Sequence, residues 1–292
     1  MKTNAIIRIV LFSLAILILA SILLGVVAFK SYRFDVGTQG ISYNGIEDVT
    51  EQIDIEYITP EIRNIEIDWV AGSITFQKDP YATEITVHEI APTGCEYIMV
   101  CKQSGQTLKI QYCDDAVSVF QFPSFGVNID ISKDLVITVP ENWECDTLEI
   151  DTAAAEVIVN DLTVKELDFD GASGECKITN CDVGEMDIDT ASGDVYFSGT
   201  LETLDCDAAS ADCTIEATNI PRSIKMDVMS GDLELILPPD AGFTCELDSM
   251  SSSFDTDFEF KMRNDQYVCG DGSCKIKISG LSGAVSILKG IE

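Results

Sequence analysis

Basic residues are scarce in this chain, and histidine is almost missing. The 292 residues include 18 Lys and Arg against 50 Asp and Glu, so the formal net charge is −32. Nucleic-acid binding needs clustered Lys and Arg to contact phosphates, so this composition excludes a nucleic-acid partner. His88 is the only imidazole, which nearly excludes a histidine-rich metal site or a Ser-His-Asp site. Because 46% of the residues are hydrophobic, the chain has enough apolar material to form a core.

One long apolar run lies near the N-terminus, at residues 9–28, and contains no charged residue. A helix of this length spans roughly 30 Å, the hydrocarbon core of a bilayer. All 50 acidic residues follow Phe34. We therefore expect a short basic cytoplasmic tail (1–8), a transmembrane helix (9–28), a linker (29–60) and an ectodomain (61–292). The expected location is the cell membrane, as a single-pass protein with an extracellular ectodomain. A cleaved signal peptide is the alternative, because Val26 and Ala28 form a weak cleavage site.

A twelve-residue pattern recurs along the ectodomain. Consecutive copies in its central part start 18 to 21 residues apart. The copies begin at Ile65, Leu148, Leu167, Met186, Leu204, Ile224, Cys245 and Ile276. A period of this length is typical of stacked supersecondary units that bury their apolar faces on one another. The regular repeats occupy about residues 144–289, and an irregular insertion occupies about residues 77–143.

Within a copy, apolar residues stand at positions 1, 3, 10 and 12, and polar residues at 2, 4, 9 and 11. This alternation has period two, so it predicts two strands on either side of a turn at positions 5–8. Position 6 is apolar in every copy, and we expect it to point inward at the corner. Position 8 is often Gly, which indicates close backbone packing more than an obligatory positive φ. A further inward position is expected at Leu162, Cys181, Leu201 and Ile220.

The predicted fold is therefore all-β, a β-solenoid of coils of about 19–20 residues with one N-terminal transmembrane helix. A sandwich of antiparallel hairpins is the alternative. In the insertion we expect strands at Glu84–Ile90, Glu96–Lys102, Thr107–Tyr112 and Val127–Val139, with a hairpin turn at Ser104–Gln106. A loop with Phe120, Phe122 and Phe125 would form either a lid on the end of the solenoid or an exposed binding patch.

The order of several short segments resembles a known family. These segments are Ile65–Phe76, Gly105–Ile110, Leu135–Pro140, the Asp-x-x-Ser-Gly-Asp turns, Leu235–Pro238 and Gly272–Ile287. In this order they resemble the bacterial "putative adhesin" domain family, a domain of unknown function made of β-strand repeats. The resemblance covers about residues 60–289. It implies a β-helix-like envelope protein, often with one N-terminal membrane segment, and it implies no catalytic residues.

The eleven cysteines are an odd number, so at least one thiol is free or paired with another chain. Five cysteines stand where other copies carry larger apolar residues, and there we expect Cys to act as a small hydrophobe. They are Cys176, Cys181, Cys206, Cys213 and Cys245. Cys269 and Cys274 flank a short turn, and a disulfide between them requires Cα atoms within about 7 Å. A zinc site is a weak alternative, since no CxxC occurs.

Carboxylates recur at two positions of the copies. Position 4 is Asp in seven copies (Asp68, Asp151, Asp170, Asp189, Asp207, Asp227 and Asp248), and position 9 is acidic in five (Glu156, Glu175, Asp194, Asp212 and Asp232). The position-4 carboxylates are expected to accept hydrogen bonds from the amides of positions 6 and 7, so Asp189→Ala should destabilise the turn. Alternatively, divalent cations bind between coils. The candidate ligands are Asp170, Glu175, Asp189, Asp194, Asp207, Asp212, Asp227 and Asp232.

These features indicate a protein without catalytic activity and without a cofactor. A glycosidase needs one carboxylate pair in two different environments, whereas five equivalent pairs indicate a structural role. We expect a membrane-anchored extracellular module that interacts with a protein or another component of the cell envelope, in the manner of an adhesion protein. The alternative is an envelope-stress or regulatory protein that acts through a membrane-protein partner.

Overall fold

The computed structural model describes residues 51–92, 95, 98–113, 132–249 and 252–290. All of them belong to one compact unit, Asp48–Glu292. These residues form strands and no helix, which confirms the predicted β class. The predicted membrane segment and Phe120, Phe122 and Phe125 lie outside the described residues. In the described part of the chain, no helix has the length and apolarity that crossing a membrane requires.

The described residues form 18 strands, because alternating apolar and polar residues suit a pleated backbone with one buried face. They are β1 (Glu51–Ile58), β2 (Asn64–Asp79), β3 (Ile85–Pro92), β4 (Val100–Ser104), β5 (Thr107–Gln111), β6 (Lys133–Pro140), β7 (Cys145–Asn160), β8 (Thr163–Gly171), β9 (Cys176–Ser192), β10 (Val195–Ser210), β11 (Cys213–Ala217), β12 (Ser223–Ser230), β13 (Leu233–Leu237), β14 (Phe243–Ser249), β15 (Ser252–Thr256), β16 (Phe260–Arg263), β17 (Gln266–Cys269) and β18 (Cys274–Lys289).

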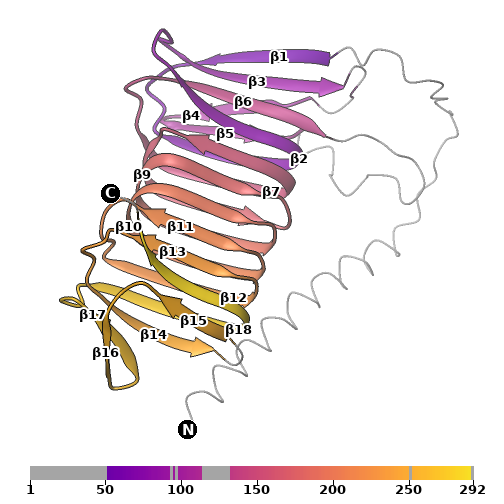
Figure 1. Cartoon of the computed structure of the whole chain (residues 1–292). Coiled ribbons are helices and arrows are strands. Elements are labelled where there is room, and N and C mark those ends of the chain that lie inside the picture. Colours follow the sequence, from indigo (N-terminus) through magenta and orange to yellow (C-terminus); the bar gives the residue numbers. More distant parts are fainter. Residues whose placement is uncertain (1–50, 93–94, 96–97, 114–131, 250–251, 291–292) are drawn as a thin grey trace, which may run out of the picture. The chain divides into compact units, whose positions relative to one another are not determined.

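The strands pair in two ladders, and the long strands contribute to both (Figure 1). Ladder 1 runs β4–β5–β2–β7–β8–β9–β10–β12–β18–β14–β17–β16. Ladder 2 runs β1–β3–β6–β2–β7–β9–β10–β11–β13–β18–β15. Pairing between the repeated coils is parallel, with Leu148 opposite Leu167. The stacked coils are therefore confirmed, and the antiparallel sandwich is wrong.

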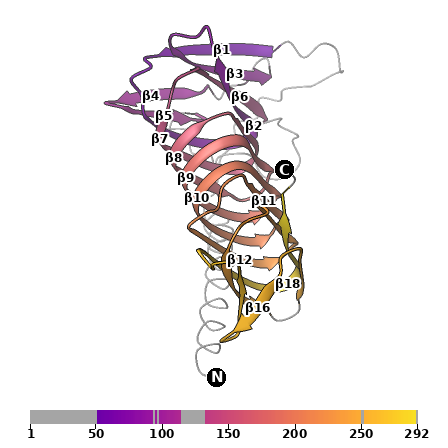
Figure 2. The same ribbon diagram turned by 60° about the vertical axis from the view of Figure 1, so that its left-hand side comes forward.

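The coils do not stack in chain order. The copy at Ile65 lies directly against the copy at Leu148, because the strands of the insertion extend the end of the stack instead of separating these two coils. At the other end, Ile276 of β18 pairs with Ile224 on one side and with Cys245 on the other. The C-terminal strand is thus inserted between the two preceding coils, and both views show β16 and β18 at this end (Figures 1 and 2).

The alternation of buried and exposed side chains continues into positions 5 to 7 of each coil, where the sequence predicted a turn. Position 5 is buried, as at Trp69 and Thr152, whereas position 6 is exposed at Ala153 and Ala172. The prediction that position 6 points inward is wrong, because the strand of ladder 1 extends to about position 7 and keeps its period of two. Leu162, Cys181 and Leu201 are buried as predicted, but Ile220 is 38% exposed.

The glycines at position 8 have two roles at the turn. Gly174 and Gly193 both have a φ of 118°, in the region that favours glycine. A Cβ at Gly193 would lie 1.9 Å from the carbonyl oxygen of Gly174 in the adjacent coil. The close backbone approach is therefore confirmed, but a positive φ is also required in these copies. Ala155 and Ala211 occupy position 8 without a positive φ, so their turns have another conformation.

In the insertion, the predicted strands correspond to β3, β4, β5 and β6 with shifted ends, and residues 96–97 and 127–131 lie outside the described residues. The hairpin turn is confirmed, since Ser104 pairs with Thr107. One charged pair is buried at this end of the core. The Lys133 ammonium contacts the Glu89 carboxylate, donates to the Tyr112 carbonyl at 2.6 Å and lies 3.8 Å from the centroid of the Tyr112 ring.

Candidate functional site

Two outward columns of acidic residues run along ladder 1. Positions 2 and 4 of a coil are two residues apart, so their side chains lie on the same face of the ladder. We call this set the acidic strip: Glu66, Asp68, Glu149, Asp151, Asp168, Asp170, Asp187, Asp189, Asp205, Asp207 and Asp227. The column at position 4 was predicted from the repeats, whereas the column at position 2 was not. The signal was available, because position 2 is acidic in the first five copies.

The register of the parallel pairs brings the carboxylates of each column together. Asp170 lies between Asp151 and Asp189, and Asp207 between Asp189 and Asp227. Neighbouring backbones in such a ladder are about 4.8 Å apart. Like charges at this spacing repel one another, so the strip requires compensation.

Lysines neutralise the strip at its two ends. Lys109 lies 3.0 Å from Asp68 and 3.9 Å from Glu66. Lys225 lies 2.7 Å from Asp205 and 3.2 Å from Asp227, and it also contacts Asp207 at 3.4 Å. Six carboxylates between these ends form no ion pair with the described residues: Glu149, Asp151, Asp168, Asp170, Asp187 and Asp189.

The crowding changes the proton affinity of the strip. Burial, followed by the charges of Asp170 and Asp68, raises the pKa of Asp151 to about 6. Burial and the charges of Asp207 and Asp170 raise the pKa of Asp189 to about 6. The pKa of Lys225 is also raised: burial alone would lower it, but the surrounding carboxylates outweigh that effect. The centre of the strip is therefore partly protonated in mildly acidic solution.

The predicted capping of the turns by position 4 is wrong. The amides of Ala172 and Ser173 donate to the carbonyls of Thr152 and Ala153 in the adjacent coil, both at 3.0 Å. Because the parallel ladder continues through positions 6 and 7, these amides are already used, and no position-4 carboxylate of the described residues accepts from them.

Carboxylates at position 9 cap backbone amides instead, and these amides belong to the adjacent coil. The Asp212 carboxylate accepts from the backbone amide of Asp232 at 2.8 Å, and the Asp232 carboxylate accepts from that of Ala284 at 2.7 Å. Asp194 accepts from the amide of Asp212 at 3.3 Å. In the described residues no three potential ligands come together to hold a metal ion. The structure therefore does not assemble a cation site from the predicted candidates Asp170, Glu175, Asp189, Asp194, Asp207, Asp212, Asp227 and Asp232.

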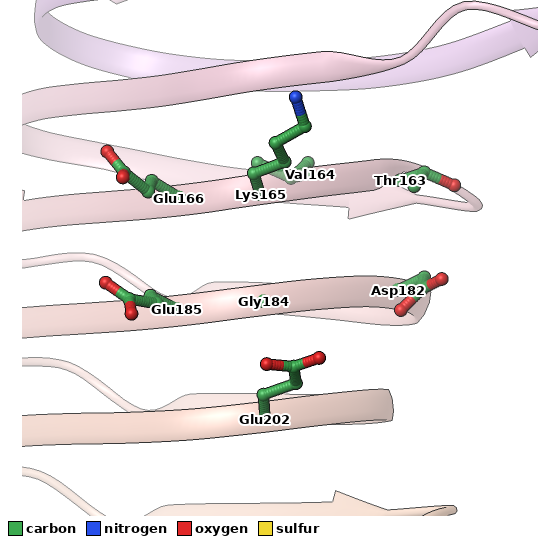
Figure 3. Close-up of a pocket in the computed structure, with 8 residues that line it drawn as sticks. All are labelled: Thr163, Val164, Lys165, Glu166, Asp182, Gly184, Glu185 and Glu202. Atoms are coloured by element: carbon green, nitrogen blue, oxygen red, sulfur yellow. The ribbon is translucent and has the colours of Figure 1, made fainter.

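A shallow hollow of about 400 Å³ lies on ladder 1, before position 1 of the coils (Figure 3). It forms at Gly184, which has no side chain to fill the space between Lys165 and Glu202. Lys165 is bound to Asp146 at 2.6 Å, and Glu185 lies 3.9 Å from Arg222. The lining offers four carboxylates together with Thr163 and Lys165, and the ammonium of Lys165 is engaged with Asp146.

The five cysteines at core positions, Cys176, Cys181, Cys206, Cys213 and Cys245, are buried as predicted. Burial raises the pKa of Cys176 to about 12, which keeps this thiol protonated and unreactive. Cys269 and Cys274 both pair with Phe243, from opposite sides of β14. Their Cα atoms are therefore about two strand spacings, roughly 9–10 Å, apart, which excludes the disulfide between them in this fold.

Comparison with known proteins agrees with this architecture. A "putative adhesin" from Bacteroides fragilis is 13% identical, with a TM-score of 0.52 over 82% of this chain and 98% of that one. A "putative lipid binding protein" from Parabacteroides distasonis is 14% identical, with a TM-score of 0.41 over 82% and 97%. At these identities the likeness concerns the fold alone. No curated protein matches the chain. The profile of the family described as Toastrack DUF4097 matches residues 62–288, and this chain therefore belongs to that family.

Proposed function

We propose that this protein is a non-catalytic interaction module of the cell envelope, anchored in the membrane by residues 9–28 with its β-solenoid outside the cell. The acidic strip is the observation that carries the proposal. It presents regularly spaced carboxylates on an open ladder, and the central six have no ion pair within the described residues. An exposed surface of this kind fits a partner with cationic groups at its own surface.

The repetition of the strip supports an interaction more than catalysis. Hydrolysis by carboxylates needs one acid and one base in different environments, whereas Asp151 and Asp189 have equivalent environments and their pKa values are raised alike. A solved structure of similar fold is described as a "putative adhesin". The proposed partner of this chain is a protein or polymer of the envelope.

The test compares the full-length chain with the triple variant Asp168→Asn, Asp170→Asn and Asp187→Asn, which neutralises the centre of the strip. Retention by purified cell walls and co-purification of membrane proteins are measured for both. A matched control neutralises three carboxylates outside the strip, Glu141→Gln, Asp161→Asn and Asp240→Asn. We expect the strip variant alone to lose its partner. Equal retention of all three proteins would contradict the proposal, and loss of a membrane protein would identify the regulatory alternative.

Protease treatment of intact cells with permeable outer layers tests the location. We expect digestion of the ectodomain. Protection would contradict the orientation, and release of a soluble form starting near Phe29 would show cleavage instead of an anchor.

A further inference from the structure

Ladder 1 changes the sign of its charge near the C-terminal end. Position 2 is acidic from Glu66 to Asp205, whereas it is Lys225 on β12 and Lys277 on β18. Glu246 on β14 is the one acidic position-2 residue among these last three copies. Beyond β14, Arg263 of β16 is opposite Gln266 of β17, and Lys261 is opposite Val268. Residues directly opposite each other point to the same face, so these cations share the outer face of ladder 1 with the acidic strip.

We define the basic patch as Lys261, Arg263, Lys275 and Lys277. All four residues are exposed. The Lys275 ammonium donates to the carbonyl of Gly272 at 2.8 Å, but none of the four forms an ion pair with a carboxylate of the described residues. A hollow of about 300 Å³ on this face is lined by Lys225, Lys275 and Lys277, with Glu246 and Gln266 also in its wall. Unpaired cations on one face are notable in a chain with 50 acidic residues.

We propose that ladder 1 is a self-association surface. Two copies meet face to face and antiparallel, so that the acidic strip of each copy lies over the basic patch of the other. A two-fold axis across the stack, near β10 and β12, generates both contacts at once. Such an interface is isologous and closes at a dimer.

The two surfaces match in spacing because both are built on strands of one ladder. Neighbouring strands are about 4.8 Å apart, and side chains two residues apart on one strand are roughly 7 Å apart. Lys275 and Lys277 have this second spacing, and so do Asp168 and Asp170. The position-6 residues beside the strip are small, as at Ala172 and Ala191, so they do not keep the two faces apart.

The available area is also sufficient. The part of ladder 1 from β7 to β16 contains nine strands. At about seven residues in each of the first seven strands and four residues in β17 and β16, this part covers roughly 800 Å² per copy, which is the size of a standard protein interface. The net charge of each copy opposes association, but charges further apart than about 8–10 Å are largely screened at physiological ionic strength. Contacts across the interface therefore dominate.

A polyanion is a poorer occupant of the basic patch than a second copy. A chain of negative charges running along ladder 1 from β18 would reach Asp205 and the rest of the strip, which repel it. An anionic membrane meets the same repulsion. A second copy instead satisfies both halves of the face.

Charge exchange between the two surfaces tests the proposal. The full-length chain is prepared in detergent as wild type, as Lys275→Glu with Lys277→Glu, and as Asp168→Lys with Asp170→Lys. Sedimentation gives the oligomeric state, and circular dichroism melts verify folding. We expect dimeric wild type, two monomeric variants, and a heterodimer when the two variants are mixed. The control Lys177→Glu, on ladder 2, should remain dimeric.

A wild type that stays monomeric at its highest soluble concentration would overturn the proposal. So would a dimer that both charge reversals leave intact, or two monomeric variants that do not combine. Binding of polyglutamate by a monomeric wild type would show that the basic patch serves an external polyanion instead. The inference uses the same acidic strip as the proposed function, so a second copy and an envelope partner compete for it. Lys275→Glu with Lys277→Glu separates the two proposals, because this variant removes the dimer contact and leaves the strip unchanged.

Discussion

Replacing one carboxylate in the centre of the acidic strip should stabilise the protein. Asp170 lies in register between Asp151 and Asp189. At about 4.8 Å two unit charges repel by about 0.9 kcal/mol in bulk water. Asp170→Asn removes two such repulsions at neutral pH, so we expect the free energy of unfolding to rise by roughly 1–2 kcal/mol. A capping role for position 4 would instead give a loss of roughly 0.5–2 kcal/mol.

The pH dependence of stability follows from the same repulsion. The pKa of Asp151 and Asp189 is about 6 in the folded chain, against 3.8 for an ordinary Asp. Between these values the folded state binds more protons than the unfolded state, so stability falls as the pH rises through this window. Acidification from neutral pH should therefore stabilise the strip. Both groups are partly in solvent, so we expect about 1 kcal/mol from each.

Urea denaturation of the full-length chain at about pH 8 and about pH 5 measures both effects. In Asp170→Asn the gain on acidification should be smaller, because Asp170 contributes to both raised pKa values. Asp248→Asn is the matched control, since Asp248 also occupies position 4 but its partner in the register is Ser279. A less stable Asp170→Asn at pH 8, or an Asp170→Asn variant that gains as much stability on acidification as the wild type, would refute the reasoning.

Four further outcomes are expected. Asp212→Ala should be less stable than Asp212→Asn by about 0.5–2 kcal/mol in urea denaturation, because only Asn keeps an acceptor for the Asp232 amide. Lys133→Ala should cost about 3–5 kcal/mol, and Glu89→Leu combined with Lys133→Met should recover most of it, because the loss comes from a buried unpaired charge. Ending the chain before β18 should remove hydrogen-exchange protection from β14 and β15 but not from β8, since β18 connects the last coil to the stack. Melting temperatures in calcium chloride and in sodium chloride of equal ionic strength should agree, and a rise of many degrees with calcium would restore the cation hypothesis.

Local periodicity was sufficient to predict the class of fold and most of the core. Leu148 and Leu167 start equivalent copies, and the structure pairs them in a parallel ladder. The core position of Cys206 was also predictable, because other copies carry larger apolar residues there. In each case the relevant information lies within one repeat, where alternation decides which side chains are buried.

Features that depend on distant segments were not predictable in this way. Ala172 points outward because the strand of ladder 1 continues past it. A small apolar residue such as Ala is also common at buried positions, so its residue type did not show this direction. The position of β18 between two earlier coils depends on the β16–β17 hairpin, which extends the opposite side of β14. The role of Asp212 was also missed, because its hydrogen-bond partner, the amide of Asp232, belongs to the next coil.

The separation of inward and outward positions explains how one fold carries surfaces of opposite charge. At position 2 the chain has Asp187 in one coil and Lys277 in another, yet the neighbouring positions 1 and 3 are buried in both coils. The core therefore does not restrict the charge of the outer columns, and the family assignment, which depends on the core pattern, does not identify a partner. Partner specificity has to lie in the outer columns of ladder 1. Exchanging charges there, as between Asp168 and Lys277, should change binding and association while the melting transition stays cooperative.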